Sequence, residues 1–320
     1  MAAHVIIHHQ HFTRIFKHSL FRAPFHGMRF LSNRSVNVKF QDESVQILLK
    51  RITGRNLERI LTNRRESGVD LPSYRLMTDN EVSMAEKNME REVEKFLEMP
   101  AVMEERKDSN IVLEQRPDLE GYTECNMVFT DISQNTTNRD RWIVVRQPNG
   151  TLRKAHWSER DRMNFLFHQR DGQSYKLPSV LENEHLKNAF DRLGHVDILD
   201  LVCVQCEADS SDYIRVHQHT YEDLHKKQAY DLLRSTRHFG GMVYYFAKHK
   251  RLTWLLVDML KRDLISDASD VVRLFYILHP TSLTEGKQLD GVELIRAYIK
   301  AEGPKALLDF IEDDVVVNVA

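Results

Sequence analysis

Hydrophobic residues recur at helical spacing in the first third of the chain. Four apolar residues at positions 45–52 follow an i, i+3, i+4, i+7 pattern and predict a short helix, which Gly54 can terminate. A second short helix follows it. Thr78 and Glu81 form a capping box that opens a longer helix, which Pro100 stops. Its apolar stripe is narrow, which is typical of a helix that lies against a neighbour.

The central region changes to the pattern of a small sheet. Residues 100–125 lack a clear period and are interpreted as an extended connection, whereas residues 127–132 and 142–146 predict strands. Residues 147–150 (QPNG) predict a turn, because Pro fixes φ and Asn-Gly accepts left-handed backbone angles. Residues 151–155 form the return strand of this hairpin. Ser158 with Asp161 predicts the start of the next helix.

The rest of the chain is predicted to be mainly helical. Ser179 and Glu182 predict another capped helix, and residues 197–206 and 213–217 predict a second strand pair. Thr220 with Asp223 predicts the start of the next helix. Further helices follow it, and the last is centred on Leu308. The predicted class is α+β, with N-terminal helices, a small central antiparallel β region with a hairpin, and a mainly helical C-terminal half.

The predicted division of the chain has four parts. They are a transit peptide at 1–34, a helical and extended segment at 35–125, an α+β core at 126–219, and a helical region at 220–320.

The N-terminal part has the composition of a mitochondrial targeting sequence. Residues 1–41 contain no Asp or Glu, and apolar residues and histidines alternate with Arg14, Lys17, Arg22, Arg29 and Arg34. Such a basic, acid-free segment responds to the potential of the inner mitochondrial membrane, and no continuous apolar run suggests a secretory signal. We therefore predict a transit peptide; a basic tail that binds anions is the alternative.

Net charge argues against a protein that coats nucleic acid over most of its surface. The chain has 45 Lys and Arg residues against 47 Asp and Glu, a formal charge of −2. Residues 1–34 hold five basic residues and no acidic one, so the remainder has 40 against 47, or −7. Proteins that cover phosphates carry the opposite sign. Any nucleic-acid contact must therefore be local.

Basic residues that could contact phosphate gather on the hairpin, on the first helical pair and before the pair Gly240-Gly241. Trp142 offers a ring on which a base could stack. The alternative is a solvated sheet face whose arginines pair with acidic neighbours, and the paired glycines suggest close approach by another backbone. The nucleic-acid-contact candidates are Arg141, Trp142, Arg146, Arg153, Lys154, Arg160, Arg162, Lys50, Arg51, Arg55, Arg64, Arg65, Arg234 and Arg237.

Motifs of common enzymes are absent from the sequence. None of the twelve glycines lies in a GxGxxG or GxxxxGK[ST] pattern, and neither GxSxG nor HExxH occurs. Three cysteines are too few for a disulfide framework. Cys203-x-x-Cys206, with His217 and His219 nearby, could suggest zinc, but in the predicted strand the two thiols point to opposite faces. We favour buried small side chains and expect no metal site here.

Two Glu-x-x-His pairs leave a metalloenzyme as an alternative. Glu182 with His185 and Glu222 with His225 have the spacing that carboxylate-bridged di-iron bundles use on two helices. The strands predicted between the two pairs argue against such a bundle.

Several segments resemble the mitochondrial small-subunit ribosomal protein 22 family. The strongest are residues 141–146 (RWIVVR) with 150–154 (GTLRK), 157–163 (WSERDRM), and 230–237 (YDLLRSTR) running into 239–243 (FGGMV). Supporting matches are residues 74–78, 128–133, 220–223 and 278–280. They span roughly residues 45–280 in consistent order.

The resemblance implies a mitochondrion-specific component of the small ribosomal subunit that touches other ribosomal proteins and small-subunit rRNA. It carries over no catalytic residue, no cofactor and no metal ligand. We therefore expect a non-catalytic structural subunit in the mitochondrial matrix, without membrane contact and not a homo-oligomer. A matrix metalloenzyme built on the two Glu-x-x-His pairs and a mitochondrial adaptor outside the ribosome are the alternatives.

Overall fold

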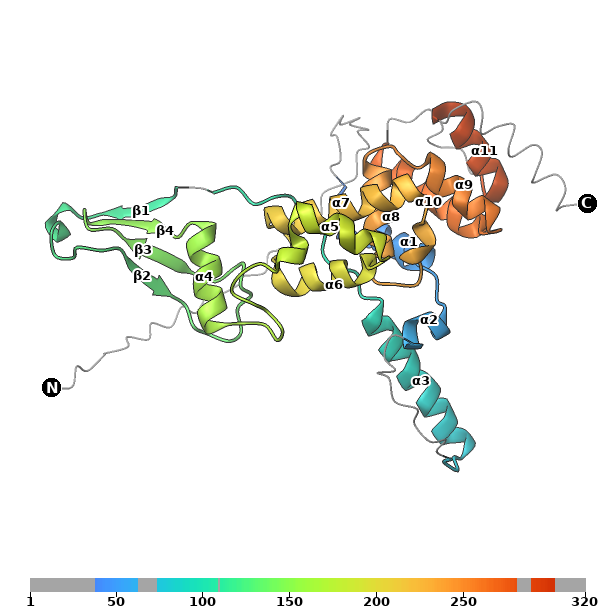
Figure 1. The fold of residues 1–320 in the computed structure, drawn as a ribbon, viewed down its shortest axis with the longest axis horizontal. Helices are drawn as coiled ribbons and strands as arrows, with labels where there is room; N and C mark the ends of the chain where they lie inside the picture. The colour runs from blue at the N-terminus through green and yellow to red at the C-terminus, as the bar shows by residue number, and fades with distance from the viewer. Residues whose placement is uncertain (1–37, 63–73, 109, 281–288, 303–320) are drawn as a thin grey trace, which may run out of the picture. The chain divides into compact units, whose positions relative to one another are not determined.

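The computed structural model describes residues 38–62, 74–108, 110–280 and 289–302 (Figure 1). The predicted transit peptide, residues 1–34, lies outside the described residues, as do Arg64, Arg65 and the helix predicted around Leu308. Within the described ranges, no helix combines the length and the apolar character needed to cross a membrane.

The first two predicted helices are confirmed. Helix α1 (Glu43–Ile52) buries its predicted apolar stripe against the C-terminal helices, and α2 (Leu57–Thr62) follows it. Between them Gly54 has a φ of +77°, a left-handed angle that glycine adopts without steric cost. The stripe consists of Val45, Leu48, Leu49 and Ile52.

The predicted capping box opens α3 (Asp79–Phe96). The Thr78 hydroxyl accepts a hydrogen bond from the Glu81 backbone N–H at 3.4 Å, and the Glu81 carboxylate accepts one from the Thr78 N–H at 2.8 Å. Val93 is the residue of this helix that is buried. Most of the apolar stripe of α3 is therefore not covered by the described part of the chain.

The central sheet has four antiparallel strands in the order β1-β4-β3-β2. Their bounds are Val112–Gln115 for β1, Met127–Thr130 for β2, Ile143–Arg146 for β3 and Thr151–Lys154 for β4. The strand at 127–132 and the hairpin are confirmed. The extended connection predicted at 100–125 is only partly right, because it also supplies the edge strand β1 and a 3₁₀ turn, Pro117–Leu119.

The hairpin turn has the backbone that its residues predict. Gly150 donates its N–H to the Gln147 carbonyl at 3.0 Å and has a φ of +79°. A Cβ at this position would also overlap the carbonyl of Arg116, which passes beside the turn. Angle and space therefore both require glycine.

Helix α4 (Trp157–Phe167) covers one face of the sheet (Figure 1). Its Met163 packs against Ile143, Val145 and Ala155, the small core of this region. The helix begins at Trp157 with His156 as its N-cap, so the cap predicted at Ser158 with Asp161 is wrong by two positions. The reason is that Glu159, three residues after His156, accepts the His156 backbone N–H at 2.8 Å.

The second strand pair is wrong, because residues 197–206 and 213–217 belong to helices. Helix α6 (His195–Gln205) is followed by α7 (Ser211–Lys227), for which Ser210 is the N-cap. The run rich in Val, Leu and Cys suggested a strand, yet its buried residues follow helical spacing. They are Ile198, Leu199 and Val202.

Two predicted helix starts in this region are also wrong. Ser179 opens a 3₁₀ turn (Ser179–Leu181), and α5 (Asn183–Asp191) begins only after Glu182. Thr220 does not start a helix but lies inside α7, where its hydroxyl donates to the Val216 carbonyl at 2.8 Å.

The main core lies among the C-terminal helices and α1. These are α8 (Phe239–Lys248), α9 (Thr253–Lys261), α10 (Ile265–Leu278) and α11 (Gly291–Glu302). Contacts of α1 with α8 and α10 insert the N-terminal helix into this core, which includes Phe246 and Phe275. The predicted α+β class, helical in its C-terminal half, is confirmed.

The glycine pair at the start of α8 is approached by side chains, not by another backbone as predicted. A Cβ at Gly240 would overlap Met99, and a Cβ at Gly241 would lie 2.9 Å from the Tyr221 hydroxyl oxygen. The two glycines therefore make room for the segment after α3 and for α7.

Candidate nucleic-acid interface

The predicted contact residues of the hairpin divide between the two faces of the sheet. Cross-strand partners share a face, so the pairing of Val145 with Arg153 puts that arginine on the face that α4 covers. The pairing of Val144 with Lys154 puts the lysine on the opposite face, which we call the open face. Trp142 precedes Ile143 by one residue and therefore lies on the open face as well.

The arginines under α4 are occupied by contacts within the chain. Arg153 is buried and donates two hydrogen bonds to Glu159, at 2.8 and 2.9 Å. The hydrogen bond from Arg153 lowers the pKa of Glu159, and the same bond raises the pKa of Arg153. This bidentate pair holds α4 to β4.

Arg141 and Arg160 stabilise the loop that precedes β3. Arg141 is 3% exposed, and its guanidinium donates to the backbone carbonyls of Asp131, Ser133 and Thr136. Arg160 donates to the carbonyls of Arg139 and Arg141 at 2.7 and 2.8 Å, and burial lowers its pKa. Arg141, Arg153 and Arg160 therefore have no free face for a phosphate, and we leave them out of the proposed contact surface.

The open face combines exposed rings with a cation. Trp142 is 59% exposed, and the Lys154 ammonium lies 4.8 Å from the centroid of its ring. Phe129 and Met127, on the edge strand β2, are also exposed. They pair across the strands with Val144 and Arg146, respectively, and therefore lie on the same face. The structure thus brings together Trp142 and Lys154, two of the candidates on the hairpin.

Arg146 lies on the open face but is partly neutralised. It donates to the Glu114 carboxylate on β1 at 3.1 Å and to the Gly150 carbonyl at 3.0 Å. The hydrogen bond from Arg146 lowers the pKa of Glu114, which is exposed. Arg146 therefore contributes less positive potential than Lys154, which has no carboxylate within 4.0 Å among the described residues.

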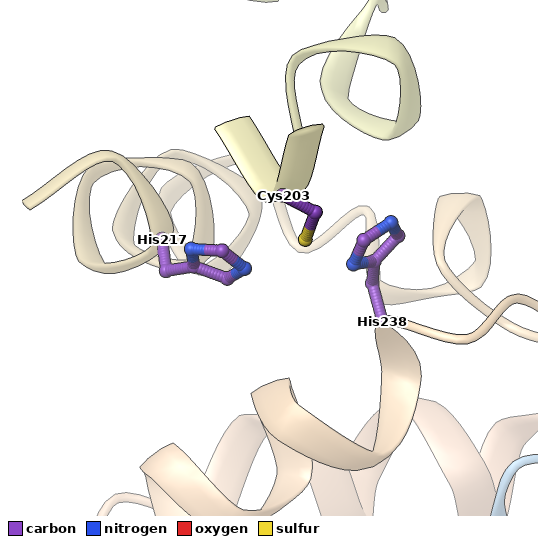
Figure 2. A group of neighbouring side chains, drawn as sticks. All are labelled: Cys203, His217 and His238. Carbon is purple, nitrogen blue, oxygen red and sulfur yellow. The ribbon is translucent and has the colours of Figure 1, made fainter. Parts of the chain in front are cut away.

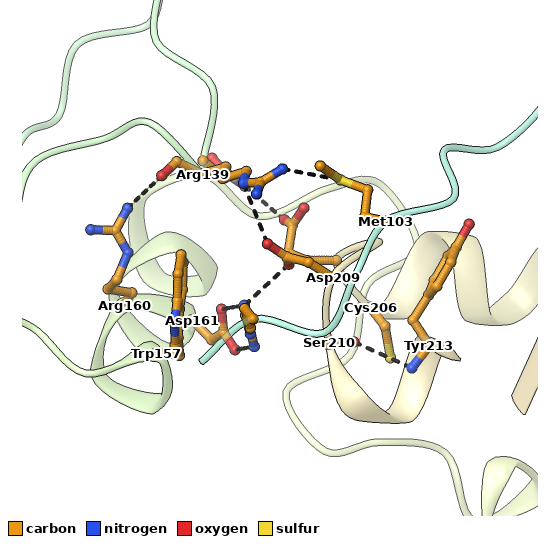
Figure 3. A network of polar contacts seen from close by, with 12 residues as sticks. Met103, Arg139, Trp157, Arg160, Asp161, Cys206, Asp209, Ser210 and Tyr213 are labelled. Carbon is orange, nitrogen blue, oxygen red and sulfur yellow. Dashed lines mark hydrogen bonds and ion pairs between the residues drawn. The ribbon is translucent and has the colours of Figure 1, made fainter. Parts of the chain in front are cut away.

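A network that the sequence did not predict joins α4 to the loop between α6 and α7 (Figure 3). Arg106 pairs with Asp161 on α4 and lies 3.7 Å from Asp209, which is buried. Arg139 approaches the same Asp209 at 3.4 Å. Asp209 lies in a polar turn, and the sequence carried no signal that this carboxylate, unlike its neighbours, is buried.

The candidates on the first helical pair differ in their partners. Lys50 is exposed, whereas Arg51 lies 3.3 Å from Asp270 and Arg55 lies 3.9 Å from Glu94. Both arginines remain exposed and accessible. The Arg55–Glu94 pair is exposed on both sides and contributes little, whereas Asp270 is buried.

The remaining candidates are also split by their contacts. Arg234 is mostly buried in an ion pair with Asp267, and Arg237 donates to Asp200 at 2.7 Å. Arg162 is exposed on α4. Of the three, Arg162 alone is exposed and has no acidic side chain within 4.0 Å among the described residues.

A second exposed surface lies on and before α3. Val82, Met84 and Met89 are exposed along the helix, and Tyr74 and Leu76, just before it, are almost fully exposed. Val82 and Met89, seven positions apart, share one face of the helix, and an exposed apolar stripe is typical of a site that another molecule covers.

The two Glu-x-x-His pairs are not assembled into a metal site. Glu222 accepts hydrogen bonds from Tyr245 and Arg251, and His225 contacts the Tyr230 hydroxyl at 2.7 Å. Among the described residues, the one group of three or more potential ligands within reach of one another includes none of the four Glu and His residues. The di-iron alternative therefore lacks its geometry.

Exposed apolar and basic surfaces such as these are typical of a subunit of a larger assembly. The model of the family described as mitochondrial 28S ribosomal protein S22 matches residues 38–280, and the chain belongs to this family. The predicted resemblance is confirmed.

Two relatives extend the similarity over most of the chain. The small ribosomal subunit protein mS22 of Bos taurus is 43% identical over 270 residues, which are 83% of this chain and 75% of the bovine protein. The protein of the same name from Mus musculus is 42% identical over 270 residues, with the same coverage.

Proposed function

We propose that this chain is a structural constituent of the mitochondrial small ribosomal subunit, located in the matrix, and that it supports mitochondrial translation without catalysing a reaction. Membership of the family over residues 38–280 carries the proposal. The names of the bovine and mouse relatives support it, since both are small ribosomal subunit proteins. Its partners are then other small-subunit proteins and small-subunit rRNA.

The open face of the sheet is the proposed rRNA contact. Trp142 and Lys154 present a ring and a cation side by side, which suits a base stacked beside its phosphate. Lys50 and Arg162 add exposed charge elsewhere on the chain. Such few, separate contacts suit a chain whose net charge is negative, because they do not require broad attraction to RNA.

The surface on and before α3 is the proposed protein contact. The exposed apolar residues Val82, Met84 and Met89 lie among the Glu and Lys residues of the helix. Against the described part of the chain the helix buries Val93, so a partner that covers its other apolar residues would add packing that stabilises it.

Sedimentation tests the proposal. A tagged full chain is expressed in mitochondria, and a matrix lysate is separated on a sucrose gradient at low and moderate salt. We expect the chain to sediment with small-subunit rRNA and with other small-subunit proteins. If it remains in the light fractions while small subunits assemble normally without it, the proposal is wrong and an adaptor outside the ribosome replaces it.

A further inference from the structure

Three potential metal ligands, two from helices and one from a helix N-cap, meet in the interior. Cys203 of α6, His217 of α7 and His238, the residue before α8, turn their side chains toward one another (Figure 2). One ligand atom from each lies within 4.8 Å of the others. His217 is 7% exposed and His238 is 1% exposed. This cluster is not used by any contact surface described above.

The ring of His217 directs a lone pair into the cluster. Its Nδ1 lies 2.9 Å from the backbone carbonyl of Tyr213. A carbonyl only accepts hydrogen bonds, so Nδ1 carries the proton and Nε2 carries the lone pair. Burial disfavours the charged form of the imidazole and lowers the pKa of His217. Nε2 is buried without a hydrogen-bond partner among the described residues.

His238 is held in the complementary way. Its Nε2 lies 2.9 Å from the Asp200 carboxylate, which also accepts a hydrogen bond from Arg237 at 2.7 Å. Nε2 is therefore the protonated nitrogen, and the lone pair is on Nδ1. Nδ1 is buried without a partner in the described part of the chain. A carboxylate behind an imidazole is the arrangement that orients metal-binding histidines.

The thiol of Cys203 cannot satisfy both imidazoles. The Tyr213 hydroxyl donates its proton to the Ala101 carbonyl at 3.0 Å. Its oxygen is therefore an acceptor for the Cys203 thiol, 3.9 Å away. The single thiol proton is therefore directed to the Tyr213 oxygen, and neither histidine lone pair receives a hydrogen bond among the described residues. A cation at the centre would satisfy both lone pairs.

We propose that Cys203, His217 and His238 bind one zinc ion, with water in the fourth coordination position. One thiolate and two imidazoles are ligands that zinc prefers, at about 2.3 Å for sulfur and 2.0–2.1 Å for nitrogen. Ligand atoms of a tetrahedral site lie roughly 3.5 Å apart, so the three side chains need to close inward modestly. Binding displaces the thiol proton to solvent.

A cavity of about 340 Å³ borders one side of the cluster. Cys203, Tyr213 and Arg237 line it together with the segment after α3, whereas His217 and His238 do not. Cys206 lines the same cavity but is not part of the ligand group, and its thiol contacts Ser210. The site therefore does not use the Cys-x-x-Cys spacing, and its ligands are 14 and 21 positions apart in sequence (203, 217, 238).

Zinc loading of the purified full chain tests the site. The chain is stripped with a chelator, reloaded with zinc and freed of excess metal, and its zinc content is measured. We expect about one zinc ion per chain in the wild type and in the controls Cys206→Ser and His219→Ala. Cys203→Ser should lose nearly all of it. Asp200→Asn, which keeps the ligands, should weaken zinc binding by about tenfold or more.

Cobalt replaces zinc for a second measurement that does not depend on stoichiometry alone. A thiolate-to-cobalt absorption band should be present in the wild type and in Cys206→Ser and absent in Cys203→Ser, with far-UV circular dichroism matched among the three. A folded wild type that binds no zinc would overturn the proposal. So would zinc binding that Cys203→Ser leaves unchanged, or that Cys206→Ser abolishes.

Discussion

On the face of the sheet that α4 covers, arginines make ion pairs and hydrogen bonds within the chain. On the open face, by contrast, a lysine contacts the ring of a tryptophan. Arg153 makes a bidentate pair with Glu159, and Arg160 donates to two carbonyls. Lys154, one residue further along the same strand, contacts the Trp142 ring instead. Neighbouring cations thus serve stability on one face and are available to a partner on the other. Charge alone does not distinguish them; burial and partners do.

Removing the carboxylate under α4 should have the largest effect on stability. Glu159→Gln leaves the buried Arg153 guanidinium without its counter-charge, and we expect a loss of about 2–3 kcal/mol in the free energy of unfolding. The value falls below that of a fully buried pair because Glu159 is 29% exposed. Urea unfolding of the full chain measures it. Glu86→Gln, on exposed α3, is the control, and an equal loss there would contradict the distinction.

The same substitution should change the response to acid. The folded chain holds the pKa of Glu159 below its ordinary value of 4.5, so the pair stabilises the fold fully above that pH. This contribution declines as the pH falls through the lowered pKa of the folded state. Unfolding of Glu159→Gln should lack this part of the pH dependence.

Reversing the charge on the open face should affect assembly instead. Lys154→Glu replaces attraction to phosphate by repulsion, and we expect roughly tenfold lower incorporation into small subunits, equivalent to about 1.4 kcal/mol. The free energy of unfolding should be nearly unchanged. The fraction sedimenting with small subunits measures the effect. Lys187→Glu, an exposed lysine on α5, is the charge-matched control; a similar loss there would assign the effect to net charge.

Removing the ring should have a smaller effect. Trp142→Ala loses a stacking surface. We expect incorporation into small subunits to weaken by about 1 kcal/mol, because Lys154 already occupies one side of the ring. Trp142→Phe should restore most of the incorporation. The same gradient assay measures both. If Phe and Ala variants behave alike, stacking on this ring is excluded.

An exposed ion pair at the edge of the sheet should have the smallest effect. Arg116 donates to Glu114 at 3.0 Å, and both side chains are exposed. Arg116→Ala should lower the free energy of unfolding by less than about 0.5 kcal/mol. A loss as large as that of Glu159→Gln would show that exposure does not separate the two pairs.

Elements with strong local signals were predictable from the sequence. The hairpin depends on the Asn-Gly turn, and α3 depends on the reciprocal bonds of Thr78 and Glu81. The strand pair at 197–217 failed because a short run of β-branched and apolar residues fits a buried strand and a buried helix equally. Ser210, the cap of α7, was the signal that could have decided it.

The sites were less predictable because they depend on packing between distant segments. Alternation along β4 separates Arg153 from Lys154, but only the position of α4 determines which face is covered. Arg141 is buried by three carbonyls of its own loop, which no periodicity indicates. The cluster of Cys203, His217 and His238 requires the fold of three helices.

Oxidation of Trp142 by hydroxyl radicals tests most directly whether the open face is a contact surface in the small subunit. The rate is compared, by mass spectrometry, between the free full chain and the chain within purified mitochondrial small subunits. In the free chain the ring is 59% exposed and should react rapidly. We predict several-fold slower oxidation in the subunit. Equal rates in the two states would contradict the account.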